Sequence, residues 1–115
     1  MKFVDIFNDI GILAKQDDAT NDLLPGIAGN LCKATEELGE LAQEINKLFG
    51  KKTWKPGDTE EIITANILEE GSDLIQCVIS ILDARGITAE QLKTTLEKKN
   101  KKYKTVLTAR ASKQV

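Results

Sequence analysis

The sequence contains no histidine among its 115 residues. Without an imidazole, the chain has no Ser–His or Cys–His nucleophilic pair and no histidine general base, and almost every kind of zinc site is excluded. Any chemistry in this protein must therefore rest on carboxylates, lysines, hydroxyl groups or a bound hard cation.

Cysteines and long apolar runs are also scarce. Cys32 and Cys77 are the only cysteines, and each lies within an apolar helical pattern, so we expect two buried free thiols and no disulfide framework. No segment approaches the ~18 consecutive apolar residues of a membrane span. The first ten residues, MKFVDIFNDI, include acids and do not resemble a signal peptide. A cytoplasmic protein without membrane attachment is expected.

The net charge is only −2, but the charge is unevenly distributed along the chain. Between Lys93 and Lys113 there are eight Lys or Arg residues and a single acid, Glu97. The acids are concentrated upstream, between Glu36 and Asp73. With 115 residues, the chain is long enough for one domain with a modest core, so residues 1–115 are expected to form a single domain.

Apolar residues recur at helical spacing over much of the chain. This pattern predicts a first helix over about residues 2–16, followed by a loop that contains Pro25 and Gly26. A second helix is predicted over about 27–49, with Gly50 placed to end it. No segment alternates in the manner of a strand.

Two capping boxes are predicted for the second half of the chain. Asp58 with Glu61 is expected to open a third helix that reaches about residue 85, and Thr88 with Gln91 is expected to open a fourth. The fourth helix is rich in lysine, and its basic tail, about residues 106–115, is expected to fray. The prediction is an all-α, four-helix, bundle-like fold. Because the third helix is apolar around much of its circumference, we also expect a homo-oligomer.

Five carboxylates form the most informative pattern in the sequence. Residues 36, 37 and 40 are glutamates that share one side of the second helix, next to its apolar stripe. Glu70 and Asp73 are three residues apart on the third helix, also beside core positions. If the two helices pack antiparallel, the acids converge, and oxygen-only ligation suits Mg²⁺ or Mn²⁺. Solvated acidic faces are the competing interpretation, which is equally good for the first cluster alone.

The segments KATEELGELAQEI and EEGSDLIQCVISIL, followed by EKKNKKY, resemble the MazG-like branch of the all-alpha nucleoside triphosphate pyrophosphohydrolases. That family has the pattern EExxE on one helix and ExxD on a following helix. Five residues match the pattern position by position: Glu36, Glu37, Glu40, Glu70 and Asp73. The resemblance covers roughly residues 27–104, most of the chain.

The resemblance implies Mg²⁺-dependent hydrolysis of a (deoxy)nucleoside triphosphate to the monophosphate and pyrophosphate, with water attacking the α-phosphorus. It implies nucleotide-pool house-cleaning with a preference for deoxynucleotides, and a homotetramer built as a dimer of dimers. The four implied metal ligands are Glu37, Glu40, Glu70 and Asp73. Glu36 would either bind a second ion or help to activate the water.

Substrate contacts outside the acids are also expected. The resemblance implies that basic residues and an asparagine near the C-terminus reach the phosphates and sugar, and Lys99 and Asn100 match that element. Tyr103 stands where the family often has a further basic residue. Trp54, in a lysine-rich loop, would either stack on a base or anchor its own loop, and the anchor is the favoured interpretation.

The residues alone also allow a different class of function. The lysine-rich fourth helix would suit a non-enzymatic nucleic-acid-binding or interaction module, because clustered lysines bind phosphate backbones by counterion release. The segment has a single aromatic residue, Tyr103, and no recognised DNA-binding motif. We therefore expect a nucleotide substrate and no stable nucleic-acid partner.

Overall fold

The computed structural model describes residues 1–20 and 26–113, and in this part of the chain every regular element is helical. The elements, in chain order, are α1 (Phe3–Thr20), α2 (Gly26–Asn46), two short 3₁₀ turns η1 (Lys47–Phe49) and η2 (Lys51–Thr53), α3 (Glu60–Ala84) and α4 (Ala89–Lys113). The all-α prediction is therefore confirmed for the described residues.

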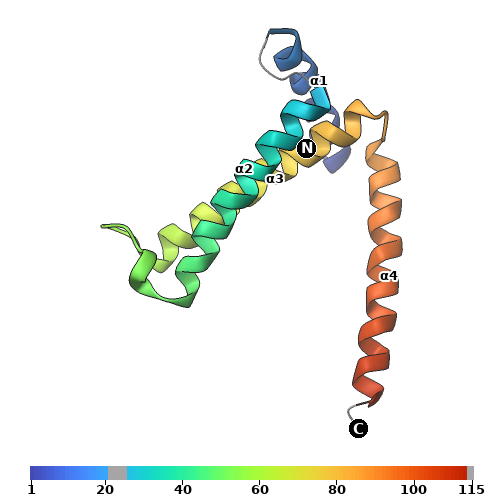
Figure 1. Ribbon diagram of the computed structural model, residues 1–115. Coiled ribbons are helices and arrows are strands. Elements are labelled where there is room, and N and C mark those ends of the chain that lie inside the picture. Colours follow the sequence, from blue (N-terminus) through green and yellow to red (C-terminus); the bar gives the residue numbers. More distant parts are fainter. Residues whose placement is uncertain (21–25, 114–115) are drawn as a thin grey trace.

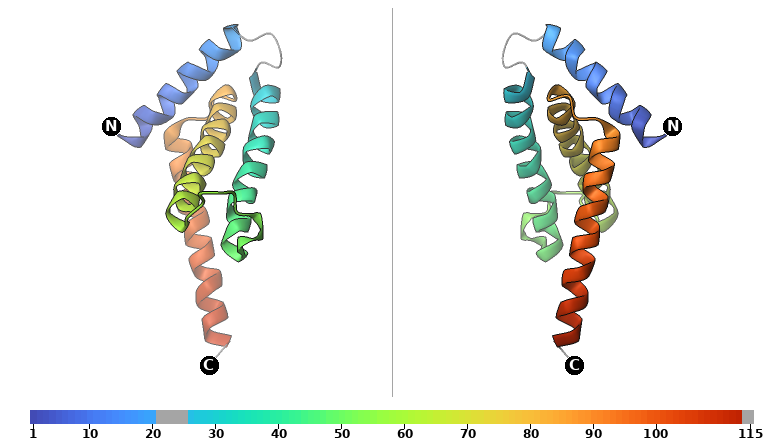
Figure 2. Two further views of the ribbon diagram at one scale, coloured as in Figure 1. Left: turned by 90° about the vertical axis from the view of Figure 1, so that its left-hand side faces the viewer. Right: turned by 90° about the vertical axis from the view of Figure 1, so that its right-hand side faces the viewer.

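The centre of the molecule is an antiparallel hairpin of α2 and α3, which run side by side over most of their length (Figure 1). The helix α1 lies across the end of the hairpin where α2 begins and α3 ends (Figure 2). Phe7 of α1 is buried there with Ile79 of α3 and Ala89 at the start of α4. Beyond this small core, α4 extends away from the hairpin as a separate arm (Figure 1).

The start of α3 differs from the sequence prediction. The hydroxyl of Thr59, not Asp58, accepts a hydrogen bond from the Ile62 amide at 3.2 Å and caps the helix. The Asp58 carboxylate instead accepts the Lys55 amide at 2.7 Å and pairs with the Lys47 ammonium at 3.1 Å. The predicted Asp58 capping box is therefore wrong, because this carboxylate stabilises the preceding turn.

The second capping box is confirmed. The Thr88 amide donates to the Gln91 side chain at 2.9 Å, and the Gln91 amide donates to the Thr88 hydroxyl at 3.1 Å. This reciprocal pair satisfies two amides that the first turn of α4 leaves without a helical partner.

Other helix boundaries shift by a few residues. The helix α1 continues to Thr20, through residues that were predicted to form a loop, and α2 ends at Asn46 before tightening into η1. Gly26 begins α2 with a positive φ of 70°, while Pro25 falls outside the described residues. The helix α4 continues to Lys113 through the tail that was expected to fray.

The chain leaves an unusually large surface exposed. Its accessible area is 9087 Å², whereas a folded monomer of 12.6 kDa has about 6,200 Å². The radius of gyration is 18.0 Å, against about 13 Å for a compact chain of this length. One predicted buried thiol, Cys32, is exposed, and only Cys77 is buried. Cys32 is exposed because the described part of the chain leaves its face of α2 uncovered.

Much of the exposed surface is apolar and follows a helical repeat. On α2, Leu31, Leu38 and Ile45 are seven residues apart and exposed, and on α3 Leu68 and Ile75 repeat the same spacing. Residues seven apart lie on one side of a helix, so each helix carries an apolar stripe that the described residues leave exposed. Among the described residues, no helix combines the length and hydrophobicity needed to cross a membrane.

Candidate metal centre and adjoining pocket

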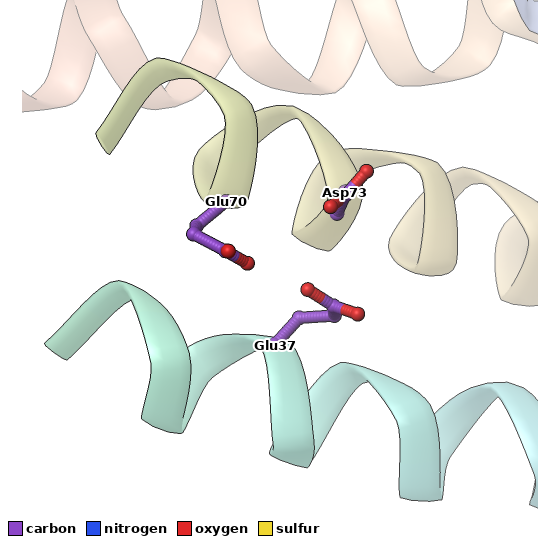
Figure 3. A group of neighbouring side chains, drawn as sticks. All are labelled: Glu37, Glu70 and Asp73. Carbon is purple, nitrogen blue, oxygen red and sulfur yellow. The ribbon is translucent and has the colours of Figure 1, made fainter. Parts of the chain in front are cut away.

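Three carboxylates meet between α2 and α3. Glu37 of α2 lies close to Glu70 and Asp73 of α3, and Figure 3 shows Glu37 and Glu70 in the space between the two helices, with Asp73 beside them on α3. One oxygen of each carboxylate lies within 4.8 Å of the other two. The antiparallel pairing brings acids that are 33 and 36 residues apart in sequence to one point. The convergence predicted for these three residues is therefore confirmed.

The carboxylates are enclosed without being neutralised. Glu37 is only 9% exposed, which is unusual for a glutamate. One carboxylate oxygen of Glu37 and one of Glu70 are buried and have no hydrogen-bond partner among the described residues. Burying an unpaired charge is costly, so enclosed carboxylates are normally compensated by a donor or a cation. The donor set fits a hard cation such as Mg²⁺, which binds carboxylate oxygens and retains waters.

The Glu70 carboxyl shows how strongly the acids interact in the metal-free protein. Hydrogen bonding with Glu40 is the largest cause that raises the pKa of Glu70, followed by burial and by hydrogen bonding with Glu37; together they raise it to about 7. A raised pKa of this kind reflects the crowding of neighbouring carboxyl groups, which a bound cation would relieve. Glu40 thus belongs to the cluster through Glu70, but it is not one of the three residues whose oxygens converge. Glu36 is exposed and also lies outside that group.

A pocket of about 280 Å³ adjoins the carboxylates on the side covered by α1. Glu37 and Asp73 line it, so the pocket and the acid cluster share two residues. Its remaining walls are apolar side chains of α1 together with polar side chains of all three helices, namely Ile10, Leu13, Ala14, Asp17, Asn30, Lys33, Gln76, Cys77 and Ser80. The site is thus a carboxylate centre that opens into a larger, mixed cavity.

Neither this cavity nor its basic residue, Lys33, was predicted from the sequence. Lys33 and Asn30 precede Glu37 by four and seven residues, so all three share one face of α2. That spacing was visible in the sequence, but the position of α1, which closes the pocket, was not. The Cys77 thiol also lines the pocket; burial raises its pKa, while the nearby Lys33 ammonium acts in the opposite direction.

The residues predicted to contact the substrate are not brought to the acids within one chain. Lys99, Asn100 and Tyr103 are exposed on α4, which points away from the α2–α3 hairpin (Figure 1). The Trp54 indole donates to the Lys47 carbonyl at 2.9 Å. In that position Trp54 anchors its own loop.

Lys47 is the centre of this loop anchor. Its ammonium is nearly buried and pairs with Glu44 and Asp58, each at 3.1 Å. Nothing in the sequence analysis singled out Lys47, because a lysine near a helix end is usually exposed. The two pairs link the end of α2 and η1 to the loop that precedes α3.

No protein-family model, curated protein or solved structure matches this chain. The geometry of the acid cluster and its pocket therefore carries the functional argument.

Proposed function

We propose that this protein is a Mg²⁺-dependent nucleoside triphosphate pyrophosphohydrolase, with Mn²⁺ as a possible substitute, and that it belongs to the MazG-like group. The observation that carries the proposal is the meeting of Glu37, Glu70 and Asp73 between two helices, with enclosed oxygens that lack donors. The resemblance of these positions to EExxE and ExxD supplies the reaction class.

In this proposal Glu37, Glu70 and Asp73 would hold the ion, and Glu40, which hydrogen-bonds with Glu70, would be a fourth ligand. A Mg²⁺ held by these carboxylates would neutralise charge on the triphosphate and would make a water molecule at the site more acidic. The water oxygen bonds to the α-phosphorus as the bond to the α–β bridging oxygen breaks, and the electron pair leaves with pyrophosphate. The proton of the water would pass to a carboxylate, for which Glu36, exposed and adjacent to Glu37 in sequence, is the candidate.

The pocket beside the cluster gives the substrate a direction. Because it shares Glu37 and Asp73 with the metal centre and has apolar walls from α1, it suits the nucleoside. The β- and γ-phosphates would then lie on the opposite, open side of the carboxylates. A deoxynucleotide in a house-cleaning reaction remains the substrate class that the resemblance favours.

We propose further that the active form is a homo-oligomer, a dimer or a dimer of dimers. A single chain exposes about 2,900 Å² more surface than a compact monomer of its mass. Obligate interfaces reach this size and are largely apolar. Pairing the exposed stripes of two α2–α3 hairpins would produce a four-helix bundle, and Lys99 and Asn100 would reach an acid cluster from a neighbouring copy.

The deciding experiment is a panel of all ribo- and deoxynucleoside triphosphates incubated with Mg²⁺. Chromatography of the products should show the monophosphate and pyrophosphate in equal amounts. Glu37→Gln should abolish the reaction, while Glu69→Gln, an exposed acid one residue before Glu70, should retain it. Release of phosphate with the diphosphate, or full activity of Glu37→Gln, would contradict the proposal.

The rival interpretation rests on α4, whose lysines are exposed on a projecting arm. The same arm also exposes Leu96, Tyr103 and Leu107, which lie on one side of the helix. An apolar stripe suits a protein surface better than a phosphate backbone, so we favour a second copy of the chain as its partner. Salt-sensitive binding to DNA without nucleotide hydrolysis would support the rival instead.

A further inference from the structure

Lys33 is the single cation among the described residues that line the pocket beside the acid cluster. It lies one helical turn before Glu37, a spacing at which lysine and glutamate commonly pair. Lys33 forms no ion pair with any described residue, although Glu37 and Glu70 each have one buried carboxylate oxygen without a described donor. A lysine serving as the structural counter-ion of Glu37 would be expected to bind it.

We propose that Lys33 binds the α-phosphate of the substrate, at the junction between the metal centre and the nucleoside pocket. The inference rests on the function proposed above and adds a residue that the EExxE and ExxD pattern does not assign.

The position of Lys33 selects this phosphate. A nucleotide whose base lies in the pocket and whose metal-bound phosphates lie at Glu37 and Asp73 must pass its α-phosphate between the two. Lys33 lines the same pocket as Glu37 and Asp73, the two acids that the pocket shares with the metal centre. The β- and γ-phosphates lie beyond the carboxylates, away from the turn of α2 that carries Lys33.

The chemistry of an ammonium group suits this position. Lysine presents a compact charge on a flexible stem and is a common phosphate ligand. During attack by water, charge accumulates on the non-bridging oxygens around the α-phosphorus, and a fixed cation there stabilises the transition state. The acid cluster cannot supply this contact, since its side chains are all negative or metal-bound when the substrate is present.

Product inhibition separates the possible contacts of Lys33. The monophosphate product retains the α-phosphate, whereas pyrophosphate carries only the β- and γ-phosphates, and the free nucleoside carries none. For Lys33→Ala we expect kcat/KM to fall at least tenfold and the inhibition constant of the monophosphate to rise at least fivefold. The inhibition constants of pyrophosphate and of the nucleoside should stay within twofold. Lys33→Arg should recover at least half of the loss in kcat/KM, compared on a logarithmic scale.

Lys52→Ala provides the control, because Lys52 is an exposed lysine in η2, outside the pocket. Lys33→Ala is expected to fold, since Lys33 is exposed and alanine is a strong helix former. Lys33→Met provides a second test, because it removes the charge and keeps the length of the side chain. Unchanged kinetics in both Lys33 variants would overturn the inference and leave the proposed function standing. A larger effect on pyrophosphate or on the nucleoside would overturn the α-phosphate assignment. If the wild-type protein hydrolyses no nucleotide, the proposed function fails and the inference fails with it.

Discussion

Replacing Glu37 with glutamine tests the metal centre directly. The substitution removes one charge from the enclosed cluster while nearly preserving the shape of the side chain. In EDTA, Glu37→Gln should be as stable as the wild type or more stable, because the repulsion with Glu70 and Asp73 is relieved. A glutamine amide can also donate to the enclosed carboxylate oxygen of Glu70, which has no described donor. A purely structural glutamate would show the reverse, with stability lost in EDTA.

The size of the metal effect follows from mass action. Mg²⁺ at 100 times its dissociation constant stabilises the folded state by about 2.7 kcal/mol. For 115 residues, the unfolding entropy is about 0.24 kcal/mol/K, so the melting temperature should rise by about 11 °C. If Glu37→Gln weakens binding about 100-fold, the same Mg²⁺ concentration contributes only about 0.4 kcal/mol, or about 2 °C.

The pH dependence gives a second, independent readout. The pKa of Glu70 in the metal-free protein is raised from 4.5 to about 7, mainly by Glu40. Its stabilising contribution is therefore present below about pH 4.5 and is lost as the pH rises through about 7. Through the Glu70 carboxyl, the wild type in EDTA should melt at a lower temperature at pH 8 than at pH 6. Mg²⁺ binds the charged form, so its stabilising effect should be larger at pH 8.

Differential scanning fluorimetry at a fixed protein concentration measures all of these shifts. Glu69→Gln serves as the control, because Glu69 is exposed on α3 and lies outside the converging acids. It should show the full Mg²⁺ response of the wild type. An equal Mg²⁺ response in Glu37→Gln and in the wild type, at both pH values, would refute the assignment of Glu37 as a ligand.

Three further results are expected. A Cβ at Gly11 would overlap the carboxylate of Asp83. Gly11→Ala should therefore destabilise the protein by about 1–2 kcal/mol in urea denaturation, despite a helix-propensity gain of about 1 kcal/mol. Adding Asp83→Ala should recover most of the lost stability. The Lys55 amide is the largest cause that lowers the pKa of Asp58, and Lys47 adds to it, so Asp58→Asn should lower the melting temperature at neutral pH, with the difference disappearing as the pH falls below about 4. Light scattering of the wild type should give at least a dimer, and Leu38→Asp, which places a charge in the exposed stripe of α2, should give monomers; a wild-type monomer at micromolar concentration contradicts the oligomer.

The sequence by itself determined the elements that depend on neighbouring residues. Apolar spacing located the four helices, and the Thr88–Gln91 box located the start of α4, because both depend on contacts within a few residues. The acid pairs were found for the same reason. Spacing of three or four residues places side chains on one face of a helix whatever the helix packs against.

Only the tertiary structure decided what these elements form together. Thr59 caps α3 in place of Asp58, because the Asp58 carboxylate, which local rules assigned to the helix, pairs with Lys47 of η1. The position of α1 created the pocket that contains Lys33. The apolar stripes of α2 and α3 are exposed in the single chain, which their spacing in the sequence did not reveal. Helix formation is local, whereas packing depends on contacts between residues distant in sequence or in another copy of the chain.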